Sequence, residues 1–346
     1  MEAASLPTGD RSFLERSPLA RLPDRVLRYG LTSLAALILI LIVYFFVALT
    51  GQAHPAFSKF GVFGFAFDNN WNVSLDQYGA LPLLVGTLVT AVLALIIGVP
   101  IAVATALYIT ELCPRRIRTP VTLLIELLAA VPSVVYGLWG LFFLAPKLEP
   151  AEKWVAAKLS FVPFFGGGSV TIPNDFITGL VLAIMILPIV SAISREVMAT
   201  VPADHKEAAL GLGATRWEMI RLAVIPYCRS GIVGGAMLGL GRAIGETIAV
   251  TILIGDDPVL GHHLFGQGYT LAAVVANEFG EATGLHRSAL FAAGLVLFVL
   301  TLIVNGFARY FVTRAARGTR IDSSGRNAGR KAVGRGDTAA SSAPGI

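Results

Sequence analysis

Two charged residues, Arg242 and Glu246, lie inside the otherwise apolar stretch 231–255. An arginine at the centre of a bilayer costs roughly 2.5–3.5 kcal/mol on insertion scales, so such a charge faces a pore or a partner. Their spacing of four residues would place both side chains on one face of a helix. They could neutralise each other. Alternatively, Arg242 could offer an oxyanion its charge and planar fork of donors while Glu246 tunes that charge, and the pattern favours this anion pathway.

A third charge, Glu126, lies in the apolar stretch 119–145, one or two helical turns from its beginning. A carboxylate at such a position can reach the membrane interface or accept a hydrogen bond within the protein, which would be a structural role. It can equally serve in gating. The sequence does not separate these two interpretations.

Patterns typical of an enzyme or a metal site are missing from the sequence. There is no G-x-x-x-x-G-K-[ST] loop, the motif that cradles the phosphates of ATP. Cys113 and Cys228 form no C-x-x-C and have no ligands at metal spacing, and His262-His263 is an isolated pair. No nucleophile–base arrangement is visible. We therefore expect no metal, no cofactor and no ATPase activity in this chain.

The composition indicates which elements position these charges. Hydrophobic residues make up 55% of the 346 and charged residues 14%, whereas soluble domains carry about 25% charged residues. A hydrocarbon core about 30 Å thick requires about 20 apolar residues in a helix. We therefore predict an all-α membrane protein with six transmembrane helices, at 29–50, 81–110, 119–145, 176–193, 231–255 and 289–308.

One further apolar stretch, 159–172, is too short to span and contains a proline and three consecutive glycines. We expect it to be interfacial or re-entrant. It follows a short amphipathic piece at 151–159, and both belong to the third loop.

The Lys and Arg residues gather on one side of the predicted spans. Of the 27, 21 fall in the two tails and in the second and fourth loops, and five fall in the other loops. By the positive-inside rule both termini and loops two and four are cytoplasmic. The predicted organisation is a cytoplasmic N-terminal tail at 1–28, a six-span domain at 29–312 and a disordered basic tail at 313–346. The basic residues follow span ends, which favours membrane lipid over nucleic acid as their partner.

The fourth loop, about 199–229, has the pattern of two short helices joined by a glycine turn. Asp204 could cap the first helix, Gly211 and Gly213 end it, and Pro226 is expected to stop the second. In the second, apolar residues recur at helical spacing, at Trp217, Ile220 and Val224. A helix held out by a tight turn suits a groove in another protein. The alternative is a helical hairpin lying on the membrane surface.

This loop resembles the EAA loop of ABC importer permeases, which reads Glu-Ala-Ala, three residues, Gly, nine residues, then Ile-x-Leu-Pro. Here Glu207-Ala208-Ala209 is followed by Gly213 and then by Ala223-Val224-Ile225-Pro226 at the same spacing. Ala223 and Ile225 depart from the usual residue types. The resemblance implies that the loop forms a coupling helix seated in a separate ATPase subunit, with these site residues: Glu207, Ala208, Ala209, Gly213 and Pro226.

Three further segments resemble phosphate importer permeases of the PstC and PstA type. The segment 241–247 reads GRAIGET, the segment 78–82 reads YGALP and is followed by Gly86-Thr87-Leu88, and 126–137 reads ELLAAVPSVVYG. The resemblance extends from about Trp71 to Ala308. The match in the first loop and the long third loop favour the PstC type.

The resemblance implies a permease subunit of an ATP-driven, binding-protein-dependent phosphate importer in a prokaryotic inner membrane. Its implied partners are a second permease subunit of the PstA type, two ATP-binding subunits of the PstB type and an external phosphate-binding protein of the PstS type. Two alternatives stay open, an ABC permease for another oxyanion such as sulfate or molybdate and an ion-coupled secondary transporter. A secondary transporter has no use for an EAA loop.

Overall fold

The computed structural model describes residues 22–162, 164–166, 169–260, 263–307 and 309–310, with side chains from Val26 onward. The predicted C-terminal tail, 313–346, lies outside the described residues. The chain divides after Gln52 into two units. Helix α1 (Leu22–Phe60) contains the first predicted span and runs past it at both ends.

Five helices in the described residues are long and apolar enough to cross a membrane, or six if one bent pair counts as a single span. α3 (Leu81–Leu107) continues through Pro100 and ends in a π turn, η4 (Tyr108–Leu112). α7 (Asp175–Ala199) contains the fourth predicted span, and the final helix, Gly284–Phe307, contains the sixth as far as Phe307, since residue 308 lies outside the described residues. The described part of 159–172 is irregular, as expected for a stretch too short to span.

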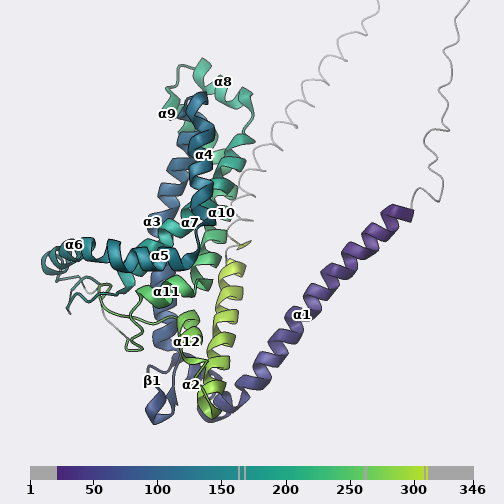
Figure 1. Ribbon diagram of the computed structural model, residues 1–346. Helices are drawn as coiled ribbons and strands as arrows, with labels where there is room; N and C mark the ends of the chain where they lie inside the picture. Colours follow the sequence, from purple (N-terminus) through teal and green to yellow (C-terminus); the bar gives the residue numbers. More distant parts are fainter. Residues whose placement is uncertain (1–21, 163, 167–168, 261–262, 308, 311–346) are drawn as a thin grey trace, which may run out of the picture. The chain divides into compact units, whose positions relative to one another are not determined.

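The third predicted span is not one helix. α4 (Arg115–Ala130) ends at a break, and α5 (Ser133–Trp139), the π turn η5 (Gly140–Leu144) and α6 (Ala145–Lys158) follow at a bend of 92°. The cause is Pro132, whose ring disfavours the helical conformation of the residue before it, and Val131 is extended with ψ 126. Figure 1 shows α5 and α6 running across the direction of α3 and α7.

The fifth predicted span also differs from its expected form. It begins earlier, because α9 (Arg216–Met219), the π turn η6 (Ile220–Val224) and α10 (Ile225–Gly245) run on as one long helix. The expectation that Pro226 would stop the second helix of the loop was wrong. Pro226 lies in the first turn of α10, where a missing N–H is tolerated, and the preceding π turn absorbs the irregularity.

α10 ends ten residues before the predicted end of the fifth span. Glu246 leaves the helix with φ −71 and ψ 128, and a short helix, α11 (Ile248–Leu253), follows Thr247. The expected single helix at 231–255 is therefore two helices separated by Glu246, which is extended, and Thr247.

The core is built on α3 and α7, which pack against each other along their lengths, and α10 packs on both. Small residues allow this approach: a Cβ on Gly98 would lie 3.0 Å from the carbonyl oxygen of Ala183, and one on Gly179 would overlap Leu93. Within a bilayer, helix association depends on such close van der Waals packing. This helix pair is the frame to which the other elements attach.

A small hairpin closes one end of the bundle. β1 (Trp71–Asn72) pairs antiparallel with β2 (Gln77–Tyr78), around the 3₁₀ turn η3 (Val73–Leu75) and after the short helix α2 (Val62–Phe67). The Trp71 Nε1–H donates to Glu278 at 3.2 Å, and Glu278 ends α12 (Leu271–Glu278). His286 Nε2 lies 2.8 Å from the same carboxylate oxygen, and its ring stacks on Tyr78. The hairpin is thereby fixed to α12 and to the final helix.

Burial and the carboxylate of Asp76 raise the pKa of Tyr78 to about 12. Its phenol therefore stays protonated at neutral pH and donates to Asp76 Oδ1 at 3.3 Å.

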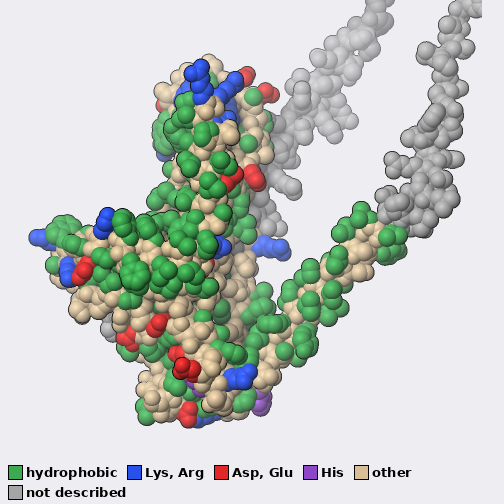
Figure 2. All heavy atoms as spheres, in the orientation of Figure 1, with side chains coloured by type: hydrophobic (Ala, Val, Ile, Leu, Met, Phe, Trp, Pro, Cys, Tyr) green, Lys and Arg blue, Asp and Glu red, His purple; other side chains and the backbone are tan. Residues whose placement is uncertain are grey.

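Charged side chains are distributed unevenly along the bundle. Figure 2 shows Lys and Arg side chains gathered at the end where α8 and α9 lie, and hydrophobic side chains along the helical middle. The basic start of α4, Arg115 to Arg118, lies next to η4 at this end. For the second and fourth loops, this distribution matches the grouping of Lys and Arg read from the sequence.

Gly86 provides a test of the packing around α3, because a Cβ there would collide with the backbone carbonyl of Tyr269. We expect Gly86→Ala to destabilise the purified protein by about 1–3 kcal/mol, since overpacking against backbone forces a shift. Gly294→Ala is the matched control, because a Cβ there meets nothing within 4 Å. The measurement is the melting temperature in detergent, and equal values for the two variants would contradict the close approach of α3 to Tyr269.

Candidate functional site

The EAA-like segment forms a short helix, α8 (Ala203–Gly211), between a proline and a glycine. Pro202 occupies the N-cap position, and Asp204 lies in the first turn without capping it, so the expected Asp204 cap was wrong. Asp204 still complements the positive end of the helix dipole. After α8, Gly213 takes φ +88, which glycine adopts without strain.

The second helix of the loop starts at a capping box that our reading of the sequence missed. The Thr215 hydroxyl accepts from the Glu218 N–H at 3.3 Å, and Glu218 Oε2 accepts from the Thr215 N–H at 2.8 Å. The signal was present as Thr-x-x-Glu directly after the glycine turn. The box fixes where α9 begins relative to α8.

α8 exposes one face and turns the other inward. Glu207 and Ala208 are exposed, whereas Lys206 and Ala209 are half-buried. Beyond the helix Leu212 is 90% exposed, and Trp217 on α9 is 63% exposed. An apolar surface of this kind, next to a carboxylate, is suited to binding a groove in a partner.

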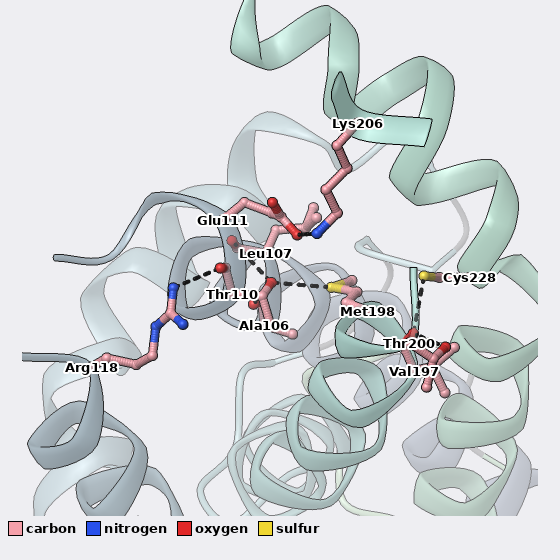
Figure 3. A network of polar contacts seen from close by, with 10 residues as sticks. All are labelled: Ala106, Leu107, Thr110, Glu111, Arg118, Val197, Met198, Thr200, Lys206 and Cys228. Carbon is pink, nitrogen blue, oxygen red and sulfur yellow. Dashed lines mark hydrogen bonds and ion pairs between the residues drawn. The ribbon is translucent and has the colours of Figure 1, made fainter. Parts of the chain in front are cut away.

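The inward side of α8 contacts the end of α3 (Figure 3) and the first part of α10. Lys206 Nζ lies 2.6 Å from Glu111 Oε1 in the π turn that ends α3. His205 makes an edge contact with the ring of Tyr227 in α10. Next to Glu111, the Thr110 carbonyl accepts from Arg118 at 2.8 Å, which joins α4 to the same end of α3.

Arg242 and Glu246 lie together, but not on one helix as predicted. Arg242 is in the last turn of α10, where the negative end of the helix dipole stabilises a cation, and Glu246 is outside the helix. Their closest nitrogen and oxygen are 4.0 Å apart, and the side chains are 40% and 10% exposed. This approach is too long for a hydrogen bond. The Arg242 donors are thus left largely unused within the described residues.

The two breaks in the spans lie against each other. α5, which follows the first break, packs on α11, which follows the second. A Cβ on Gly137 would lie 3.0 Å from Ile252 and 3.2 Å from the Cα of Ala249, so the two short helices approach closely. Non-helical backbone at membrane depth is tolerated only inside protein or beside a water-filled cavity. Arg242 is four residues before the second break, and Gly241 and Gly245 beside it face open space in this chain.

Glu126 pairs with a residue that sequence reasoning did not connect to it. Arg195 Nη2 lies 2.9 Å from Glu126 Oε1, and Arg195 Nη1 donates to Thr122 at 2.9 Å. The pair links α4 to α7. Glu126 is 55% exposed and Arg195 is 16% exposed.

Within the part of the chain that the structure describes, no group of three His, Cys, Asp or Glu side chains is placed to hold a metal ion. Cys113 and Cys228 are both buried and free. Of the predicted isolated pair, His262 lies outside the described residues.

Residues 98–317 match the family model described as binding-protein-dependent transport system inner membrane component. The chain belongs to this family of ABC importer membrane subunits.

The family assignment extends to close relatives of this permease. This chain is 44% identical over 285 residues to the phosphate transport system permease protein PstC of Pasteurella multocida (strain Pm70), and the match covers 81% of this chain and 88% of the relative. It is 41% identical over 298 residues to the protein of the same name from Mesorhizobium japonicum, covering 85% and 91%. Within the family, the chain belongs with the permeases named PstC.

Solved structures show the same fold. A chain of a bacterial ABC transporter involved in the import of the acidic polysaccharide alginate superposes with a TM-score of 0.57 at 20% identity, covering 85% of this permease and 99% of that chain. The multi-pass permease fold expected from the sequence is confirmed, and membership in the family agrees with a subunit that is not itself the ATPase.

Proposed function

We propose that this chain is the PstC-type membrane subunit of an ATP-driven, binding-protein-dependent importer of inorganic phosphate in a prokaryotic inner membrane. The observation that carries this proposal is the 44% and 41% identity to relatives named phosphate transport system permease protein PstC, over 88% and 91% of their lengths. Their names favour phosphate over sulfate or molybdate. The family is one of binding-protein-dependent transport, which argues against an ion-coupled secondary transporter.

The complete importer would contain three further kinds of subunit. A PstA-type permease would pair with this chain, two PstB-type subunits would hydrolyse ATP, and a PstS-type protein would deliver phosphate from outside. The exposed face of α8, with Glu207 and Ala208, supports contact with an ATP-binding subunit. The alginate transporter of the same fold has been solved with its periplasmic binding protein, which supports this kind of partner.

The orientation follows from the basic residues. We place the α8 end in the cytoplasm, because Lys and Arg gather at that end. We place both termini there as well, because the sequence of each tail is rich in Arg. The hairpin end, with Trp71 and Tyr78, then faces outward. Between the α8 end and the hairpin end, membrane lipid would contact the helices. The limits of the N-terminal tail, 1–28, and of the permease domain, 29–312, remain predictions.

Arg242 is the proposed transient site for the anion, with Glu246 beside it. The guanidinium is 4.0 Å from the Glu246 carboxylate, so its donors are free to bind phosphate oxygens, and a nearby carboxylate weakens that binding. A weak site allows release. The break after α10 would let α11 and α5 move against each other while Arg242 stays on the long helix.

This proposal predicts different defects for changes at the anion site and for changes at α8. In cells, we expect Arg242→Ala to lower phosphate uptake about 10- to 100-fold, because hydrogen bonds to a charged group are lost. Arg242→Lys keeps the charge but not the planar fork and should retain part of the uptake. Glu207→Ala should lower uptake about tenfold by weakening the contact with the ATP-binding subunit.

Uptake of labelled phosphate is measured with the membrane level of each variant checked, and Lys153→Ala on the exposed side of α6 serves as the control. Normal uptake by Glu207→Ala would contradict the coupling role of α8. Normal uptake by Arg242→Ala would show that Arg242 is structural.

Glu126 is proposed as a gating residue, because its pair with Arg195 joins α4 to α7 across the cytoplasmic half. An exposed ion pair contributes at most about 1 kcal/mol to stability. We therefore expect Glu126→Gln to slow uptake by about threefold or more while the melting temperature changes by less than about 3 °C. An unchanged uptake rate, or a fall in uptake that follows lost stability, would favour the structural role.

A further inference from the structure

The coupling helix α8 has few attachments to the transmembrane core. None of its residues is buried. Ala209 rests on an apolar cluster under the loop, which also contains Ala106 of α3 and Met198 of α7. The chain itself connects α8 only to α7, through Val201 and Pro202, and to α9 and α10, through Gly213. Neither covalent route leads to α3.

The one described ion pair between α8 and the core leads directly to α3. Lys206 Nζ and Glu111 Oε1 are 2.6 Å apart, and the side chains are 24% and 9% exposed (Figure 3). The other short Lys–Glu pair, Lys153 with Glu149 in α6, is also 2.6 Å long but is 59% and 38% exposed. Water therefore screens the Lys206–Glu111 pair much less.

The two partners connect α8 directly to the end of α3. Glu111 lies in the π turn that ends α3. α3 packs on α7 and on α10, and α10 contains Arg242. π turns interrupt the regular helix ladder and are frequent at functional sites. Lys206 precedes Glu207, so the inward contact and the outward-facing carboxylate come from the same turn of α8.

We propose that Lys206 and Glu111 form a positioning ion pair that transmits movement of α8 to α3. The inference rests on the proposed function of α8 as the coupling helix, and adds the route by which its movement enters the core. A pull on α8 by the ATP-binding subunit moves Lys206, the ion pair carries Glu111 with it, and the end of α3 shifts against α7. The two residues act through the helices and do not touch the transported anion.

The test is the amount of phosphate imported per ATP hydrolysed by the complete importer in liposomes. We expect Lys206→Met and Glu111→Gln each to lower this ratio about fivefold at unchanged levels of assembled complex, within the range of measured coupling effects. The exchanged variant, Lys206→Glu with Glu111→Lys, should return the ratio to within about twofold of the wild type. Lys206→Arg should keep it, and Glu149→Gln, from the exposed matched pair, should leave it unchanged.

Each result distinguishes the pair from other roles. If Glu111→Gln imports phosphate with the wild-type ratio, the proposal is overturned. It is also overturned if only the Lys206 variants lose coupling and the exchange does not restore it, because Lys206 would then contact the ATP-binding subunit itself. A purely structural role would lower the amount of assembled complex and leave the ratio intact.

Two further checks keep the outcome clear. Should the charge-removing variants fail to assemble, Glu111→Asp keeps the charge and shortens the reach by one methylene; a lowered ratio is expected, and an unchanged ratio overturns the proposal. If the wild-type complex imports no phosphate with ATP, the proposed function fails first. A wild type that imports phosphate with variants that keep its ratio rejects only the ion pair.

Discussion

Close packing of α3 against α7 is the contact on which the rest of the structure depends. In a bilayer the lipid tails are as apolar as the side chains, so helices associate through tight contact at small residues. Gly98 and Gly179 provide it here. α10 packs on this pair, α4 is tied to α7 through Glu126 and Arg195, and α8 reaches α3 through Lys206. A shift between α3 and α7 would therefore move the elements at the end of the bundle where α8 lies.

The two breaks inside the predicted spans lie where the proposed function needs irregular backbone. The two span breaks, at Val131-Pro132 and at Glu246-Thr247, lead into short helices that pack on each other. Breaks of this kind are sustained only where protein or a cavity surrounds them, which suits a pathway shared with a second permease subunit. Arg242 combines a position at the end of a long helix with donors left largely unused within the described residues, which suits the proposed transient anion site.

Long apolar runs made most of the fold predictable. The first, second and fourth spans and the described part of the sixth lie within the helices observed, because their length and lack of charge permit little else. Hydropathy does not register a single residue leaving the helix, so the breaks at Pro132 and Glu246 were missed, although a proline inside the third span gave a signal. The end of the EAA-like helix followed from the spacing of its glycines, whereas Pro226 did not stop the second helix. The Lys206–Glu111 and Arg195–Glu126 pairs were not predictable, because each joins residues more than 60 positions apart.

ATP-dependent phosphate accumulation by the complete importer in liposomes tests the central claim most directly. The liposomes contain this chain with its PstA-type partner and the ATP-binding subunits, and the phosphate-binding protein is added on the outward side. Phosphate should accumulate only when ATP and the binding protein are both present, and sulfate should not compete. Phosphate entry that persists without ATP and follows an imposed ion gradient would contradict the account.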